Sequence, residues 1–219
     1  MNKFAVECID ITKQYGYLYA LRKLNINIEI GEIVGILGHN GAGKSTFLKI
    51  IGTHLSPTAG SLNILGNDVK KVRSKVRRSI GFVGHTSFMY DELTSEENLR
   101  FYGKMFSIYG ESLEKKIDQV LDQVDIDKYR YVAIKKLSHG LRKRADLARI
   151  FLHSPEILIL DEPFSGLDQT VVETLVDLLK KQSGVTSLLS SHSSELLKEF
   201  CGRIITFSEG KLVNDAKGD

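Results

Sequence analysis

The chain has 219 residues, 42% of them apolar and 26% charged, and its formal net charge is +3. This length and composition are those of an ordinary globular protein that needs no disulfide or metal staple. The charge is too balanced to indicate a dedicated nucleic-acid binder, so no nucleic-acid partner is expected. The two cysteines, Cys8 and Cys201, are isolated, which fits a reducing compartment.

The first predicted elements are two strands of different character. Residues 24–30, LNINIEI, alternate apolar and polar side chains, which predicts a half-buried antiparallel strand. After Gly31, residues 32–38, EIVGILG, form the continuous apolar run of a strand buried on both faces. Residues 44–55, KSTFLKIIGTHL, carry helical spacing, so a strand, a loop and a helix follow one another.

Residues 85–155 differ from the rest of the chain because their periodicity is helical. Helices are expected over 94–106, 111–124 and 139–153, the first opening with a capping box at Ser95 and Asn98. Three further buried strands are predicted outside this region, at residues 79–84, 156–163 and 185–192. The tail, NDAKGD at 214–219, is expected to be disordered.

These elements predict an α/β protein in a single domain spanning residues 1–219. Its core of mostly parallel sheet takes residues 1–84 and 156–219 and includes an antiparallel β part, and a helical subdomain over 85–155 interrupts it. No run of 18 apolar residues occurs, so no membrane span is predicted, and the chain is expected to be cytoplasmic or peripheral at a membrane.

The loop between the second strand and the helix fits the phosphate-binding pattern G-x-x-x-x-G-K-[ST]. Its glycines let backbone N–H groups approach phosphate oxygens, Lys44 reaches the β- and γ-phosphates, and the Ser45 hydroxyl can ligate Mg²⁺. A glycine-rich turn without a ligand is the alternative. The residues expected to bind nucleotide here are Gly38, His39, Asn40, Gly41, Ala42, Gly43, Lys44, Ser45 and Thr46.

Two neighbouring acids end the strand ILILDEP. Asp161 is placed to hold Mg²⁺, and Glu162 can act as the general base for the attacking water. A pair of solvated acids at a strand end is the alternative, and the phosphate loop makes it the weaker one.

In their order, these motifs make the chain similar to the ATP-binding cassette (ABC) ATPases over nearly its whole length. The resemblance implies a P-loop NTPase fold with ATP and Mg²⁺ as ligands. Tyr15 matches the adenine-stacking aromatic residue, with Tyr17 and Tyr19 close by; Asp168 ends the loop FSGLD, and His192 matches the histidine that contacts the γ-phosphate. His85 stands where the family has a glutamine that touches Mg²⁺ and water; a loop residue outside the site is the alternative.

The stretch LSHGL at 137–141 resembles the family's signature motif, LSGGQ. There the resemblance implies a helix start that faces the γ-phosphate of a second copy, so that two ATPs lie between two chains. Ser138 supplies the hydroxyl and Gly140 the close backbone approach, while His139 costs roughly 1–2 kcal/mol if its position demands a left-handed backbone. We interpret the motif as a working variant; a helix N-cap without a ligand is the alternative.

The resemblance further implies a separate membrane permease and a place on the inner face of the cell membrane. Residues 81–106, together with PFSGLD at 163–168, are most similar to the ATP-binding subunit of haem exporters used in cytochrome c maturation. Phe88, Met89 and Tyr90 are expected either to form the docking surface or to fill the core of the helical subdomain. Residues 70–78, KKVRSKVRR, would meet anionic lipid or form a solvated helix face.

Other functions stay open at this point. A drug, lipid or polysaccharide exporter shares parts of the pattern, and a soluble ABC ATPase of DNA repair or translation is a second alternative. A non-hydrolysing nucleotide-binding regulator is a third, and Glu162 and His192 argue against it.

Overall fold

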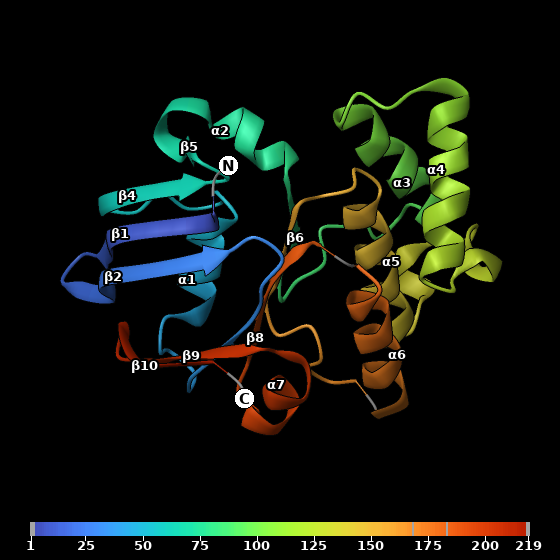
Figure 1. The fold of residues 1–219 in the computed structure, drawn as a ribbon. Helices are drawn as coiled ribbons and strands as arrows, with labels where there is room; N and C mark the ends of the chain where they lie inside the picture. Colours follow the sequence, from blue (N-terminus) through green and yellow to red (C-terminus); the bar gives the residue numbers. More distant parts are fainter. Residues whose placement is uncertain (1–2, 168, 183, 218–219) are drawn as a thin grey trace. The chain divides into compact units, whose positions relative to one another are not determined.

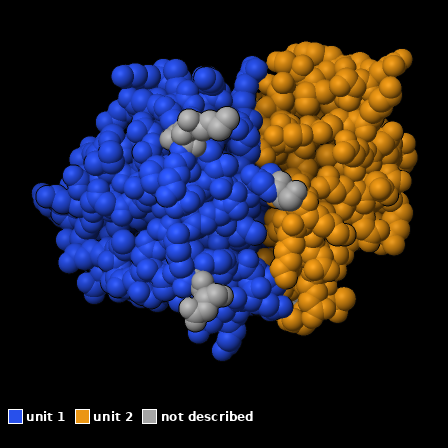
Figure 2. All heavy atoms as spheres, viewed as in Figure 1, with its two compact units in different colours: residues 1–82, 156–163, 183–219 blue, residues 83–155, 164–182 orange. Residues whose placement is uncertain are grey.

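The computed structural model describes residues 3–167, 169–182 and 184–217, which form two compact units (Figure 2). The first unit comprises the described parts of residues 1–82, 156–163 and 183–219, and the second those of residues 83–155 and 164–182. No helix in the described part of the chain is both long and apolar enough to cross a membrane.

The first unit contains an antiparallel sheet with the strand order β2-β1-β4-β5 (Figure 1). In β2, the side chains of Leu24, Ile26 and Ile28 are buried and those of the residues between them are exposed. This confirms the half-buried strand predicted at 24–30, although the strand begins earlier. The four strands are β1 (Phe4–Tyr15), β2 (Leu18–Glu29), β4 (Ala59–Ile64) and β5 (Asn67–Asp68).

A six-stranded sheet follows the order β10-β9-β3-β8-β7-β6. Strand β3 runs parallel to β8 and β9, β7 runs parallel to β8, and the edge strand β10 is antiparallel to its neighbour β9. The predicted buried strands are therefore present, and the α/β class is confirmed. The strands are β3 (Ile33–Leu37), β6 (Ile80–Val83), β7 (Ile157–Leu160), β8 (Thr186–Ser191), β9 (Arg203–Ser208) and β10 (Lys211–Lys217).

Helix α1 (Lys44–Ile51) begins at the end of the loop that follows β3 and is anchored in the core of the first unit. Phe47 meets Phe207 of β9 edge to face, with ring centroids 5.1 Å apart. Because this anchoring fixes α1, it also fixes the loop before it. The unit's other helices are α2 (Val69–Arg78) and α7 (Ser194–Phe200).

Helices build the second unit, and residues 85–155 contain no strand. Gly103 lets α3 and α4 pack closely, because a Cβ there would lie 2.2 Å from Leu113. Glu96 forms ion pairs with Arg100 at 2.9 Å and with Arg130 at 3.3 Å. The helices are α3 (Ser95–Met105), α4 (Gly110–Gln123), α5 (His139–Phe151) and α6 (Gln169–Lys180), with short 3₁₀ turns at Asp127–Tyr129 and Ile134–Lys136.

The capping box of α3 lies one residue before the predicted one. Thr94 is the N-cap: its hydroxyl accepts from the Glu97 N–H at 3.2 Å, and the Glu97 carboxylate accepts from the Thr94 N–H at 2.8 Å. The Thr94 hydroxyl also donates to this carboxylate at 2.8 Å, and the two bonds that the carboxylate accepts from Thr94 lower the pKa of Glu97. Asn98 serves another purpose, because its amide oxygen accepts from the Tyr90 N–H at 2.7 Å and ties down the preceding loop.

The disorder expected at 214–219 is also wrong for residues 214–217, which belong to β10 and pair with β9. Asp215 accepts two hydrogen bonds of 2.6 Å from the Arg203 guanidinium. This ion pair orders a polar segment whose composition alone favours disorder.

Candidate functional site

The loop at residues 38–43 has a backbone that only glycine can adopt at two positions. Gly43 has φ of +109°, and a Cβ there would lie 2.7 Å from the carbonyl oxygen of Ala20. Gly38 has φ of +154°, and its Cβ would lie 2.5 Å from the carbonyl oxygen of Phe207. The N-terminus of α1 has no side-chain cap, so its N–H groups are available to an anion.

Lys44 is almost wholly buried, and its ammonium group lies within the loop. Its Nζ donates to the Gly38 carbonyl at 2.6 Å and lies 3.5 Å from a carboxylate oxygen of Glu162. The loop and the end of β7 therefore meet around one cation, which is the charge that phosphate recognition requires.

Ser45 and Asp161 lie together at the start of α1 and the end of β7. The Ser45 hydroxyl donates to Asp161 Oδ1 at 3.0 Å, and Asp161 is only 2% exposed. A hydroxyl and a carboxylate are the hard oxygen ligands that Mg²⁺ accepts while it keeps several waters. These two residues therefore fit the predicted ion, although no group of three or more His, Cys, Asp or Glu that could hold a metal occurs among the described residues.

Ser190, at the end of β8, is a site residue that the sequence analysis missed. Its hydroxyl donates to Asp161 Oδ1 at 2.7 Å and accepts from the Glu162 N–H at 2.9 Å. One buried side chain thus holds both acids. The signal in the sequence was weak: β8 reads TSLLSS, in which a pair of serines follows two leucines.

Glu162 combines an unusual backbone with two charged neighbours. Its φ is +51°, a left-handed conformation that costs a non-glycine residue roughly 1–2 kcal/mol. One carboxylate oxygen faces Lys44, and the other lies 3.2 Å from Nδ1 of His192, whose ring is largely exposed. The carboxylate is therefore oriented from both sides, as a general base must be.

Tyr15 lies at the end of β1, in the hairpin that leads into β2. Its ring is half exposed, and the Lys13 ammonium lies 5.1 Å from its centroid. Ala20 of β2 lies against Gly43, which brings this hairpin close to the phosphate loop. Tyr17 and Tyr19 are exposed on the same hairpin, so the choice of Tyr15 stays a prediction.

The predicted signature residues lie at the start of α5 in the second unit. Ser138 is the N-cap, and its hydroxyl accepts from the Leu141 N–H at 3.3 Å. His139 is the first helical residue and is not among the residues with positive φ, so the cost of a left-handed backbone does not arise. A Cβ on Gly140 would lie 3.3 Å from Val171 of the same chain, and the approach of Gly140 to the nucleotide of a second copy stays a prediction.

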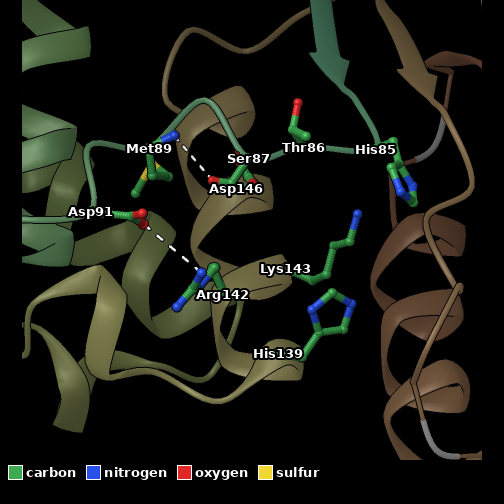
Figure 3. Close-up of a pocket in the computed structure, with 9 residues that line it drawn as sticks. All are labelled: His85, Thr86, Ser87, Met89, Asp91, His139, Arg142, Lys143 and Asp146. Carbon is green, nitrogen blue, oxygen red and sulfur yellow. Dashed lines mark hydrogen bonds and ion pairs between the residues drawn. The ribbon is translucent and has the colours of Figure 1, made fainter.

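His85 also belongs to the second unit, whereas Ser45 and Asp161 belong to the first. It lines a cavity of about 320 Å³, in which Arg142 points toward Asp91 and Lys143 extends from α5 on the side of His85 (Figure 3). The remaining lining residues are Thr86, Ser87, Met89, His139 and Asp146. Asp168 lies outside the described residues, so its predicted role is not addressed by the structure.

The predicted docking residues separate in the structure. Met89 is buried, so the prediction of a docking role is wrong for this residue, whose side chain fills the core of the helical unit. Phe88 and Tyr90 are exposed, and Phe101 packs edge to face on Tyr90 with centroids 5.0 Å apart. Three exposed aromatic residues, together with one exposed methionine, are named the aromatic patch: Phe88, Tyr90, Phe101 and Met105.

The sequence of this chain is similar to those of several known proteins. A family model described as "ABC transporter" matches residues 21–165. The bacitracin transport ATP-binding protein BcrA of Bacillus licheniformis is 34% identical over 98% of this chain and 70% of its own length. The ABC transporter ATP-binding protein NatA of Bacillus subtilis is 33% identical over 89% of this chain and 80% of its own length.

One similar protein is far longer than this chain, and solved structures of ATP-binding cassettes share the chain's fold. The chain spans 9% of the rat ATP-binding cassette sub-family A member 2, with which it shares 34% identity over 94% of its own length. The dimeric structure of the ATP-binding cassette MJ0796 bound to ADP and Pi superposes with a TM-score of 0.89 at 30% identity, covering 97% of this chain and 98% of that one. These comparisons give no support to the haem-exporter subfamily in particular.

Proposed function

Because the chain belongs to the ABC transporter family, we propose that it is the ATP-binding and ATP-hydrolysing subunit that powers a separate membrane permease. The observation that carries this proposal is the contact between the phosphate loop and the acids of β7: Lys44 with Glu162, and Ser45 with Asp161. A regulator that only bound nucleotide would have no need of an oriented base beside the lysine.

ATP binds with its phosphates on the loop at residues 38–46 and its adenine against Tyr15. Lys44 neutralises the β- and γ-phosphates, and the N-terminus of α1 adds its dipole. Ser45 and Asp161 would hold Mg²⁺, which supplies charge neutralisation on the phosphate oxygens when it is bound.

Hydrolysis uses Glu162 as the base. Its carboxylate takes a proton from water while the water oxygen bonds to the γ-phosphorus, and the bond to the bridging oxygen breaks, so that ADP and phosphate leave. His192 lies 3.2 Å from the Glu162 carboxylate, from where it orients the base and can reach the γ-phosphate. His85 would sense the state of the site through Mg²⁺ or the attacking water.

The site is completed by a second copy of the chain. In this proposal Ser138 and Gly140 of each copy face the γ-phosphate bound by the other, and Asp168 lies at the same interface. Dimeric cassettes among the similar structures support this arrangement. Loss of the γ-phosphate removes the bridging ligand and reopens the dimer, which is a ligand-driven shift of population.

The permease is proposed to dock at the aromatic patch, with the cassette on the inner face of the cell membrane. Export is the proposed direction, since relatives are named for bacitracin and multidrug transport. Within exporters we keep the haem-exporter subunit as the specific proposal, resting on residues 81–106 and 163–168. Another small exporter of drugs, lipids or polysaccharides, or a soluble ABC ATPase, is the alternative.

Affinity purification from native membranes tests this function. The bait is tagged Glu162→Gln protein held with ATP and Mg²⁺, and mass spectrometry identifies what it retains; a Lys44→Ala bait is the matched control. We expect multi-span membrane proteins with the first bait and fewer with the second, and cytochrome c maturation components would single out the haem exporter. Exclusively ribosomal, DNA-bound or other soluble partners would contradict the transport function.

A further inference from the structure

The imidazole of His139 joins the start of α5 to a turn far along the sequence. Its Nε2 lies 3.2 Å from the carbonyl oxygen of Ser165, and a Cβ on Gly166 would lie 3.7 Å from the same nitrogen. A carbonyl oxygen can only accept, so Nε2 carries the hydrogen and donates. The contact therefore requires a hydrogen on Nε2 and fixes the orientation of the ring.

The turn at residues 164–167 presents this carbonyl oxygen through its own backbone conformation. The Leu167 N–H donates to the Phe164 carbonyl at 3.3 Å, and Gly166 has φ of +71°. A positive φ at the third residue alone is the mark of a type II turn, whose central peptide is flipped by roughly 180° relative to type I. The carbonyl of that central peptide, Ser165 C=O, is the one that His139 holds.

The same segment also packs on the next residue of the helix. A Cβ on Gly140 would lie 3.3 Å from Val171 and 4.0 Å from Leu167. The start of α5 and residues 164–171 thus form one block in the second unit. The Ser138 hydroxyl, one residue before His139, is part of that block.

We propose that His139 is a positioning residue for the site formed between two copies. By holding the Ser165 carbonyl, it fixes the turn and the N-terminus of α5 in one arrangement, so that Ser138 meets the γ-phosphate of the other copy. A glycine at this position could not donate such a bond. This inference rests on the proposed function, because it gives His139 a role in presenting the signature helix.

Three substitutions at one position test the bond. His139→Gln places an amide N–H at about the reach of Nε2, His139→Asn places it at about the reach of Nδ1, and His139→Ala removes the donor. The exposed Lys136, two residues before Ser138, gives the control variant Lys136→Ala. Each variant is assayed for kcat and KM of ATP hydrolysis, and for binding of a fluorescent ATP analogue to the monomer.

We expect His139→Ala and His139→Asn to lower kcat by about threefold to tenfold, the effect of losing one hydrogen bond. Nucleotide binding to the monomer should be unchanged, and His139→Gln and Lys136→Ala should stay within about twofold of wild type. Wild-type kcat in His139→Ala, or equal losses in Gln and Asn, would overturn the inference.

A spectroscopic readout separates positioning from general damage to the fold. In ¹⁵N-histidine-labelled protein, the ring signal that disappears in His139→Gln should be that of an imidazole with a hydrogen on Nε2. A ring without a hydrogen on Nε2 would contradict the bond.

Failure of this inference can be told from failure of the proposed function. If Ser138→Arg is inactive and His139→Ala behaves as wild type, the positioning role of His139 is rejected and the site between two copies is retained. If Ser138→Arg turns over ATP at the wild-type rate, the site between two copies falls, and the role of His139 with it.

Discussion

At Glu162, the chain accepts a strained backbone to place a carboxylate between Lys44 and His192. The strain is offset by the bond from its N–H to the Ser190 hydroxyl at 2.9 Å. Strained residues that the surrounding structure holds in place are common at catalytic positions, and here the geometry agrees with the role predicted from the strand ILILDEP.

Replacing the base tests that role. Glu162→Gln keeps the shape of the side chain but cannot take a proton, so we expect ATP hydrolysis to fall by about 10²-fold or more while ATP binding persists. Single-turnover hydrolysis and binding of a fluorescent ATP analogue measure the two effects. Hydrolysis as fast as wild type would reject Glu162 as the base.

Ser190 should matter for both stability and turnover. Ser190→Ala removes the buried one of the two hydroxyls that donate to Asp161, and it leaves the Glu162 N–H without its acceptor. We therefore expect the free energy of unfolding to fall by about 1–3 kcal/mol and kcat to fall as well. The control is Ser191→Ala at the end of the same strand, because its hydroxyl accepts from the Ser193 N–H instead. Urea denaturation and steady-state assays compare the two variants. Equal losses in both would show that the hydrogen bonds between Ser190 and the two acids do not determine stability or turnover.

The two cysteines should be unreactive in the folded protein. Burial raises the pKa of Cys8 and of Cys201 to about 12 from an ordinary value of 9.0. The thiols stay protonated in the folded state, so their contribution to stability is present below pH 9 and is lost as the pH rises toward 12. Labelling with a disulfide reagent at pH 8 should be slow until urea is added. Rapid reaction of both thiols in the native protein would contradict this burial.

Among the elements, α2 shows how a basic sequence can serve the fold. Arg73 and Arg77 both bond the carbonyl of Thr53, and Arg77 Nε also donates to its hydroxyl at 3.0 Å. Thr53 is fully buried with φ of +59° and follows α1 by two residues. These contacts favour a structural role for part of the basic stretch over a purely lipid-facing one.

We therefore expect Arg77→Ala to lower the free energy of unfolding by about 1–3 kcal/mol, since it removes charge-assisted bonds to a strained turn. The matched control is Arg78→Ala, the exposed arginine next to it on the helix, which should change stability by less than about 0.5 kcal/mol. Thermal or urea unfolding measures both. If the two variants are equally stable, the arginines do not hold the turn, and a role at anionic lipid becomes the better explanation.

Predictability from the sequence varied between elements for physical reasons. Residues 24–30 alternate cleanly, so β2 could be predicted, whereas β1 carries shifts in register near Cys8 and Lys13 that break the alternation. Residues 214–217 of β10 are mostly polar, and their pairing with β9 and the bond from Arg203 to Asp215 order them as a strand. Sequence patterns report local preference, and these strands depend on partners distant in the sequence.

The candidate site shows the same division. The phosphate loop, Asp161 and Glu162 could be predicted because glycine, lysine and acid at fixed places after buried strands have few other uses. The role of Ser190 could not be predicted, since this serine becomes a hydrogen-bond partner of the two acids only when the parallel pairing of β7 and β8 brings them together. His139 likewise gains a partner only through the fold.

At the scale of the whole molecule, the two units divide the predicted machinery. Lys44, Ser45, Asp161, Glu162 and His192 lie in the first unit, and His85, Ser138 and Gly140 in the second. In the proposed mechanism, a second copy brings its signature helix to the nucleotide bound by the first.

The most direct measurement of that claim is the mass of Glu162→Gln protein by light scattering, with and without ATP and Mg²⁺. We predict a monomer of 24.5 kDa without nucleotide or with ADP, a dimer of twice that mass with ATP, and a monomer again when Ser138→Arg is added to Glu162→Gln. Ser138→Arg in the otherwise wild-type chain should abolish ATP turnover while leaving ATP binding intact. A mass that does not respond to ATP, or a Ser138→Arg protein that dimerises and turns over as before, would contradict the account.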